Sequence, residues 1–375
     1  MGLFDLFTGA RISNPSFKLT NSKFEEVNPV EKCVFYLEGC NPLVKKGEEI
    51  EVGQVLGQST EEFAVPVLST VKGKVLEVSE KFNAEGKKIK AVVVSEIEES
   101  SVDFEKVSIE GLDKSQLLVK MNELALRDED GKSLSAKLNS FNGDKVFVNV
   151  KSPSFEPNFK QYDALNAMVE EIEIGKKVVN TILSNVDIIE RPIDMLEEVE
   201  ENVLVLDLHT LVYIGEAFST GRPHMYEYLS VFGSAANANK LVKVKVGTTV
   251  EELFNKLQGN NEELYKVVAG GAIRGNSLFT LDVAISNNLK GILFLNKKEG
   301  SKGAEFSCIR CAKCLRVCPK GLNPIKLVEL WDRNEMDEFI KFGGDKCIEC
   351  GLCSYVCPSN IEIAHKIKTA KEFKR

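Results

Sequence analysis

Several residue patterns that enzymes and membrane proteins commonly need are scarce or missing here. The chain has only three histidines, far apart, and no Ser or Cys stands in a nucleophile-elbow context. There is no Walker loop. No apolar run approaches the roughly 20 residues that span a bilayer, and the N-terminus lacks the basic start and long apolar stretch of a signal peptide. We expect a cytoplasmic protein without a transmembrane segment, with peripheral membrane association left open.

A net charge of −8 argues against nucleic acid as a partner. The charge is uneven, because residues 303–375 hold 13 basic and 10 acidic side chains, so the remainder is strongly acidic. A mildly basic end on an acidic body has two interpretations. It is either a docking face for an acidic redox partner or a solvated surface with uneven charge.

Cysteine is concentrated at the C-terminal end, where eight of the ten cysteines fall between Cys308 and Cys357. A secreted disulfide scaffold would spread them through a small domain. Here they form two runs, 308–319 and 347–358, which both read C-x2-C-x2-C-x3-C-P. Bacterial two-cluster ferredoxins hold their clusters with this run. The alternative is zinc, but structural zinc sites use C-x2-C pairs rather than triplets followed by Cys-Pro.

In such paired runs the fourth cysteine of each run ligates the other cluster. We therefore predict two 4Fe–4S clusters. The predicted ligands are Cys308, Cys311, Cys314 and Cys357 for cluster 1, and Cys347, Cys350, Cys353 and Cys318 for cluster 2. We also expect each fourth cysteine at the start of a helix, because the following proline fits a first helical turn.

The remainder of this C-terminal segment predicts helices. Residues 324–342 have the apolar spacing of one or two short helices. Ser359 and Glu362 have the spacing of a capping box, and one helix face then follows with Ile363, Ile367 and Ala370. We expect a mostly helical cluster domain.

The N-terminal third predicts strands and turns. Residues 10–99 resemble half of a biotinyl- or lipoyl-type barrel–sandwich, but the hairpin at 60–64 has no lysine to modify. Cys40 precedes Asn41-Pro42 in a predicted turn and is a candidate redox thiol. The alternative is that Cys33 and Cys40 are isolated cysteines, one of them buried as a small hydrophobe.

The middle of the chain alternates strand and helix patterns. Strands are predicted at 145–150 and 203–208, and helices at 162–184 and 211–219, as in nucleotide-binding α/β folds. A β-grasp-like unit is then predicted from a strand at 243–250, a helix at 251–257 and the Gly270-Gly271 turn.

Together, the barrel–sandwich start, the α/β middle, the β-grasp and the two cysteine runs resemble the RnfC-like family of electron-transport proteins, nearest to its proline-reductase-associated members. The resemblance implies a multidomain α+β fold. Its predicted divisions are a barrel–sandwich at 1–100, a degenerate α/β flavin- or NADH-binding-like domain at 101–235, a β-grasp of the soluble-ligand-binding type (SLBB-like) at 236–298 and a two-cluster ferredoxin-like domain at 299–375.

The chain departs from this family at its flavin loop. Flavin-binding members have a glycine-rich loop, whereas residues 126–138 keep only Gly131, Lys137 and Leu138. Asp128, Glu129 and Asp130 would place bulk and negative charge where a phosphate needs close backbone N–H groups. Downstream, the family's Glu-Cys-Glu-Pro survives only as the pair 156–157. We expect no FMN.

These observations favour an adaptor that relays electrons and is not a stand-alone catalyst. Its donor would be an NADH dehydrogenase or a ferredoxin, and its acceptor a partner reductase of the proline reductase type. One alternative is an FMN- or NADH-dependent subunit of an Rnf-type or corrin-reductase-type complex. Another is a binding module with purely structural clusters. Sequence fixes neither the cluster potentials nor the direction of electron flow.

Overall fold

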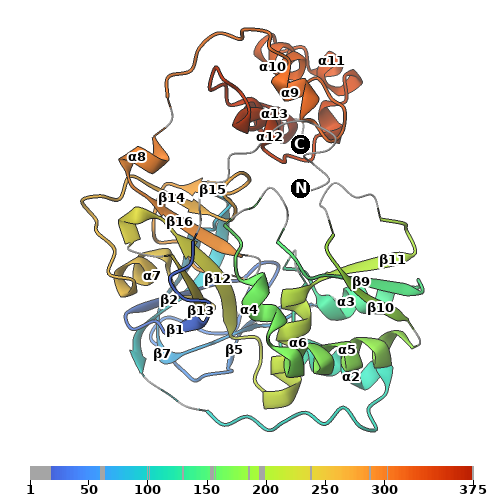
Figure 1. The fold of residues 1–375 in the computed structure, drawn as a ribbon. Helices are drawn as coiled ribbons and strands as arrows, with labels where there is room; N and C mark the ends of the chain where they lie inside the picture. Colours follow the sequence, from blue (N-terminus) through green and yellow to red (C-terminus); the bar gives the residue numbers. More distant parts are fainter. Residues whose placement is uncertain are drawn as a thin grey trace.

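The structure is a computed structural model. It describes residues 18–59, 64–98, 100, 102–128, 131–152, 156, 158–184, 186–193, 199–236, 239–286, 289–301 and 303–373. Four sheets and their helices form the body, and a helical lobe at the C-terminal end lies at one end of the molecule (Figure 1). Within these described ranges, no helix is both long enough and apolar enough to cross a membrane.

The N-terminal region consists of two small sheets, which confirms the predicted barrel–sandwich. The first sheet has the order β2-β8-β7-β4 and the second the order β3-β5-β6. Their strands are β2 (Lys32–Tyr36), β3 (Asn41–Pro42), β4 (Glu49–Ile50), β5 (Val55–Gln58), β6 (Val67–Leu68), β7 (Lys72–Phe82) and β8 (Lys88–Glu98). Gly47 and Gly53 make turns at φ of 86° and 84°, which glycine adopts without strain. Most of the hairpin predicted at 60–64 lies outside the described residues.

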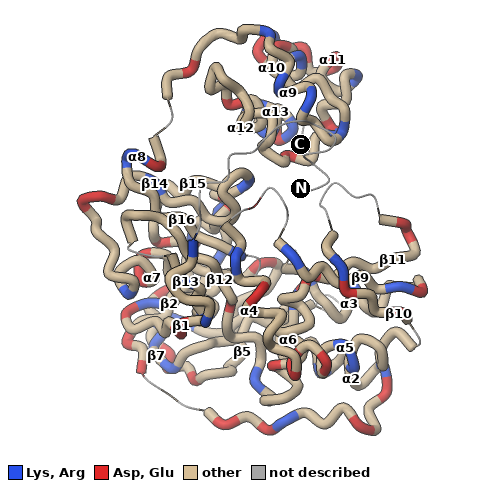
Figure 2. Tube along the Cα trace, viewed as in Figure 1, with Lys and Arg blue, Asp and Glu red and all other residues tan. Residues whose placement is uncertain are grey.

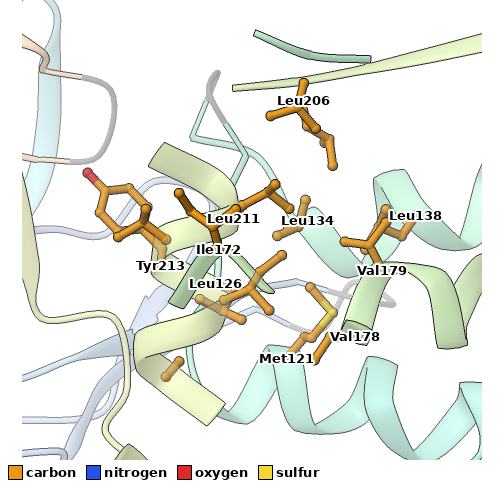
Figure 3. Close-up of a cluster of buried hydrophobic side chains, with 14 of the residues drawn as sticks. Met121, Leu126, Leu134, Leu138, Ile172, Val178, Val179, Leu206, Leu211 and Tyr213 are labelled. Atoms are coloured by element: carbon orange, nitrogen blue, oxygen red, sulfur yellow. The ribbon is translucent and has the colours of Figure 1, made fainter. Parts of the chain in front are cut away.

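The middle region is a three-stranded parallel sheet with the order β10-β9-β11. Its strands are β9 (Lys145–Asn149), β10 (Asp187–Arg191) and β11 (Val203–Asp207). Its helices are α2 (Lys114–Glu123), α3 (Leu134–Ser140), α4 (Tyr162–Asn166), α5 (Val169–Leu183) and α6 (Leu208–Thr220). The single helix predicted at 162–184 is therefore two, α4 and α5. Figure 3 shows the core of this region, with Met121, Leu134 and Val178 gathered from three helices toward Leu206 of the sheet.

A six-stranded sheet, in the order β1-β13-β12-β16-β14-β15, joins distant parts of the chain. Its elements are β1 (Phe24–Val27), β12 (Tyr226–Phe232), β13 (Lys240–Lys245), β14 (Lys266–Ala269), β15 (Asn276–Leu278), β16 (Gly291–Leu295) and the helix α7 (Val250–Lys256). Strands β1 and β12 lie outside the predicted β-grasp range 236–298, and β1 pairs in parallel with β13. The strand predicted at 243–250 ends earlier, because the chain turns at Gly247, whose φ is 96°.

The C-terminal lobe contains only helices and turns within residues 303–373 as described. The helix α8 (Lys297–Gly300) precedes the lobe. The helices of the lobe are α9 (Lys313–Arg316), α10 (Pro324–Asp332), α11 (Met336–Lys341), α12 (Leu352–Tyr355) and α13 (Ile363–Phe373). The one or two short helices predicted at 324–342 are two, α10 and α11. The buried face of α13 consists of Ile363, Ile367 and Ala370, as predicted.

The predicted capping box at the start of α13 is wrong. The Ser359 hydroxyl donates a hydrogen bond to the carbonyl oxygen of Ser307 at 3.1 Å. The backbone N–H of Ala364 instead donates to the Ser354 hydroxyl oxygen at 2.8 Å, so a side chain from α12 caps α13. A contact between segments 52 residues apart has replaced the local one.

Candidate iron–sulfur centres

Both cysteine runs have the same backbone path. The first contains left-handed residues at Arg310 and Ala312 (φ 55° and 58°), and the second at the equivalent Glu349 and Gly351 (φ 55° and 76°). Three of these four are not glycine, so their conformation is unfavourable unless the surroundings impose it. The third cysteine of each run then lies in a short helix, α9 or α12. Such reversals let a short loop wrap around a compact group.

The fourth cysteines follow these helices and do not begin new ones. Cys318 comes after the end of α9, and Pro319 lies in the turn that leads to α10. The proline in the first turn of α10 is Pro324. The predicted placement of the Cys-Pro pair at a helix start is therefore wrong, because the turn from α9 to α10 still needs several residues.

The eight cysteines of the lobe line two cavities. Cys308, Cys311, Cys314 and Cys357 line one, and Cys318, Cys347, Cys350 and Cys353 line the other. Each cavity thus receives three cysteines from one run and the fourth from the other run. These are the same two sets of four that the sequence assigns. Among the described residues, no three potential ligands converge closely enough for a single metal ion; a 4Fe–4S cubane binds each thiolate at a separate iron.

Backbone N–H groups point at the sulfurs of both cavities. The N–H of Arg310 donates to Cys308 Sγ and that of Glu349 to Cys347 Sγ, each at 3.4 Å. The N–H of Leu322 donates to Cys318 Sγ at 3.3 Å. Hydrogen bonds of this kind favour the thiolate form and are one of the features that set the potential of a bound cluster.

The two cavities differ in their exposure to solvent. Cys308 is exposed, whereas its equivalent Cys347 is half-buried, and Cys311 is half-buried, whereas its equivalent Cys350 is buried. The third cysteines, Cys314 and Cys353, are equally buried at 8% exposed. Burial, together with the neighbouring thiols, raises the pKa of Cys353 to about 12. A thiol with so high a pKa stays protonated at neutral pH unless a metal takes the place of its proton.

The second cysteine loop packs against the body of the protein. A Cβ at Gly351 would lie 2.6 Å from the carbonyl oxygen of Ile273, so only glycine fits at this contact. The side chain of Ile273 packs beside Val317, Cys350 and Leu352. Ile273 belongs to the turn between β14 and β15, which Figure 1 places beside the lobe.

The buried carboxylate of Glu156 holds that same turn through backbone hydrogen bonds. Glu156 is 3% exposed and accepts hydrogen bonds from the N–H groups of Ile273 at 3.4 Å and Arg274 at 3.2 Å. Burial raises the pKa of Glu156 to about 7. A Cβ at Gly271 would collide with this carboxylate. The sequence flagged Glu156 only as the remnant of a family motif, and its partner is more than 100 residues away.

The remnant of the flavin loop forms a turn closed on itself. The N–H of Lys132 donates to Asp128 Oδ1 at 2.8 Å, and Lys137 Nζ lies 3.6 Å from Asp128 Oδ2. Asp128 is 8% exposed, and Gly131 makes the turn at φ of 75°. Glu129 and Asp130 lie outside the described residues. The lysine that the family resemblance assigns to the flavin loop therefore faces a carboxylate of its own chain.

A polar network that the sequence did not reveal lies at the carboxyl end of β11, the edge where parallel sheets commonly bind ligands. Asp207 caps α6 and accepts from the Tyr162 hydroxyl at 2.6 Å, and it lies 2.9 Å from Lys290 Nζ. Burial acts to raise the pKa of Asp207, but Lys290 and His209 outweigh it and hold that pKa well below its usual range. This network ties the parallel sheet to the segment leading into β16.

The two remaining cysteines lie in the barrel–sandwich. Cys33 is fully buried, and burial raises its pKa well above the usual value, as expected for a cysteine packed as a small hydrophobe. Cys40 is half-buried, and its thiol donates to the carbonyl oxygen of Val65 at 3.8 Å. A redox role for Cys40 stays a prediction.

Comparison with known proteins defines the class of this protein. Residues 14–99 match the RnfC barrel sandwich hybrid domain, and residues 307–361 match the 4Fe-4S dicluster domain. The first match confirms the RnfC-like barrel–sandwich at the N-terminal end, and the second confirms a 4Fe–4S domain at the C-terminal end. The protein combines an RnfC-type N-terminal domain with a C-terminal 4Fe–4S domain.

Particular relatives match most of the length. One is a component of the Na(+)-translocating ferredoxin:NAD(+) oxidoreductase complex of Acetobacterium woodii, which is 26% identical, with 80% of each chain covered. Another belongs to the proton-translocating ferredoxin:NAD(+) oxidoreductase complex of Clostridium ljungdahlii and is 24% identical, covering 88% of this chain and 86% of that one. A solved NAD+-reducing [NiFe]-hydrogenase overlaps with a TM-score of 0.41 at 10% identity, over 70% of this chain and 54% of that chain, a likeness too slight to argue from.

Proposed function

We propose that this protein is an electron-transfer component that carries two 4Fe–4S clusters and passes electrons between redox partners. Cluster 1 is held by Cys308, Cys311, Cys314 and Cys357, and cluster 2 by Cys347, Cys350, Cys353 and Cys318. The observation that carries the proposal is the sharing of cysteines between the two cavities, each of which takes its fourth from the other run. Bound clusters of this type supply one-electron chemistry.

The chain's own residues fix the two centres relative to each other. Because Cys318 and Cys357 each belong to one loop and line the other cavity, neither loop can move alone once both are ligated. Buried side chains of α10 and α13, such as Leu327 and Ile367, fill the space between the loops. This packing places Cys314 of the first cavity and Cys353 of the second in one buried apolar cluster.

We further propose that the flavin site of the family has lost its function here. A flavin phosphate would have to displace Asp128 from Lys137 and from the backbone N–H of Lys132. Asp128 is nearly buried, so it cannot swing into solvent without disturbing the turn. Repulsion between the phosphate and this carboxylate would weaken binding further.

The relatives support membership in a larger redox assembly. The names of the Acetobacterium woodii and Clostridium ljungdahlii relatives describe ferredoxin:NAD(+) oxidoreductase complexes. By analogy, we propose a ferredoxin or an NADH dehydrogenase as donor and a reductase as acceptor, in the cytoplasm or at a membrane surface. A proline reductase as acceptor is a hypothesis that neither of these relatives supports.

A second candidate function is an FMN- or NADH-dependent subunit of an Rnf-type complex. It is favoured by similarity over 80% or more of both relatives. The two candidates differ at the Asp128–Lys137 turn, and flavin content separates them.

The test is analysis of the full chain purified without oxygen. We expect about eight irons and eight sulfides per chain, two paramagnetic clusters after reduction with dithionite, and no stoichiometric FMN even after incubation with excess FMN. Zinc in place of iron would refute the electron-transfer proposal. If the clusters resist reduction by dithionite, they are structural and the electron-transfer proposal fails. Stoichiometric FMN with NADH oxidation would establish the second candidate instead.

A further inference from the structure

The two cysteine loops share one backbone conformation but have opposite surroundings. In the second loop, Ile348 and Glu349 are half-buried, and Gly351 is pressed against Ile273. At the equivalent positions of the first loop, Ile309 is 66% exposed and Arg310 is also exposed. One loop is therefore covered by the body, and the other faces solvent.

Exposed apolar and basic side chains gather around the first loop. We call this set the loop 1 face; its members are Phe306, Ile309, Arg310, Lys313, Leu315 and Arg316. Phe306 is 63% exposed and Leu315 42%, which is unusual for large apolar residues so close in sequence. Figure 2 shows the basic residues around α9.

The charge of the loop 1 face has one sign. Residues 306–316 contain three basic residues and no acidic one. Among the described residues, no carboxylate forms an ion pair with Arg310 or Lys313. Arg316 lies against the loop itself, donating from Nη2 to the carbonyl oxygen of Cys311 at 3.3 Å. An apolar centre with basic neighbours is complementary to a partner surface that is apolar at its centre and acidic at its rim.

We propose that the loop 1 face is the electron port of this protein, and that it docks an acidic electron-carrier protein. The inference rests on the proposed function, because it needs a cluster in the first cavity. One electron then passes between that cluster and the partner's redox centre, so one centre is oxidised and the other is reduced. Cys308, which is exposed and adjacent in sequence to Ile309, is the ligand of that cluster nearest to solvent.

The second loop is a poor site for the same contact. The turn that contains Ile273 packs against Gly351 and so covers part of the second loop. The residue equivalent to Arg310 is Glu349, whose carboxylate forms an ion pair with Lys371 Nζ at 2.6 Å. An acidic partner gains no attraction from a neutralised pair. The second loop therefore packs against the body of the protein, and the first loop is the one that faces the partner.

Binding and electron transfer test the port separately. The probe is an acidic 2Fe–2S ferredoxin, whose spectrum differs from that of 4Fe–4S clusters. Its Kd is measured by anaerobic calorimetry on the cluster-loaded full chain, and its reduction by the dithionite-reduced chain by stopped flow. The test variant combines Arg310→Glu with Lys313→Glu. The control combines Arg333→Glu with Lys341→Glu, which changes net charge equally at two exposed positions. Arg333 directly follows α10, and Lys341 ends α11.

We expect the test variant to weaken ferredoxin binding and slow electron transfer by about tenfold or more at low ionic strength. Salt screens surface charges, so this difference should shrink severalfold at about 0.3 M salt. The control should change either value less than about twofold. Ile309→Gln, which changes no charge, should weaken binding severalfold at every salt concentration.

Three outcomes would overturn the port. The first is equal weakening in the test and control variants, which would show a general effect of net charge. The second is wild-type rates and Kd in the test variant, with iron content and reduced-cluster spectra intact; the proposed function would then stand without this port. The third is binding to phosphatidylserine vesicles that the test variant loses, with no binding of ferredoxin. Absence of clusters from the wild-type chain would remove both proposals together.

Discussion

If each cluster takes its fourth cysteine from the other run, removing Cys318 and removing Cys357 should affect different clusters than they would if each run bound its own cluster. The parent variant combines Cys308→Ala with Cys311→Ala, which removes two ligands from the first cavity. We expect it to retain one cluster, or about four irons per chain, in the second cavity. The question is then which fourth cysteine that remaining cluster uses.

Two matched variants of this parent give the answer. If the runs are crossed, adding Cys318→Ala removes a ligand of the remaining cluster, and the iron content falls to about three or fewer with a changed spectrum. Adding Cys357→Ala should leave about four irons and an unchanged spectrum. Both side chains are half-buried, so their truncation disturbs packing to a similar extent and the difference reports ligation.

The assay is iron and sulfide content together with the low-temperature paramagnetic resonance of dithionite-reduced protein. Circular dichroism checks that all three variants keep their helices. Uncrossed runs predict the reverse pattern, in which Cys357→Ala damages the remaining cluster and Cys318→Ala does not. That result would refute the shared-ligand reasoning while leaving two clusters in place.

Three further predictions concern the body. The folded state holds the Glu156 proton up to a pKa of about 7, against 4.5 for a free carboxyl. The contribution of Glu156 to the free energy of unfolding should therefore be largest below pH 4.5 and fall by about 3 kcal/mol as the pH rises through 7. The difference in unfolding free energy between wild type and Glu156→Gln, measured by denaturant titration, should change by this amount over that range, and a constant difference would contradict the prediction. Gly271→Ala should lower the unfolding free energy by about 2 kcal/mol or more, since its Cβ meets that carboxylate, and the loss should be much smaller in a Glu156→Ala background. Gly215→Ala, whose Cβ would strike the carbonyl oxygen of Glu171 between α5 and α6, should cost about 3 kcal/mol by thermal unfolding; a cost under about 0.5 kcal/mol would show that the helices separate easily.

Local sequence rules predicted the elements whose causes are themselves local. Apolar spacing gave α10, α11 and the buried face of α13. Regular strand patterns gave β9 and β11. The same rules failed where a side chain formed a hydrogen bond with a distant segment instead of with its own helix. The Ser359 hydroxyl donates a hydrogen bond to the carbonyl oxygen of Ser307 and does not cap α13. The proline in the first turn of α10 is Pro324, five residues after the predicted Pro319.

The spacing of the cysteines alone predicts which residues bind iron. The spacing between the cysteines can be read from the chain directly. The left-handed conformation of Arg310, Ala312 and Glu349 could not be predicted, because these residues are not glycine and their surroundings impose it. The difference between the two loops, by contrast, arises from tertiary packing. Ile273 covers Gly351, Glu156 anchors the turn that carries Ile273, and no such contact covers Ile309. Burial depends on which distant segment packs against a loop, and two nearly identical runs therefore acquire different surroundings.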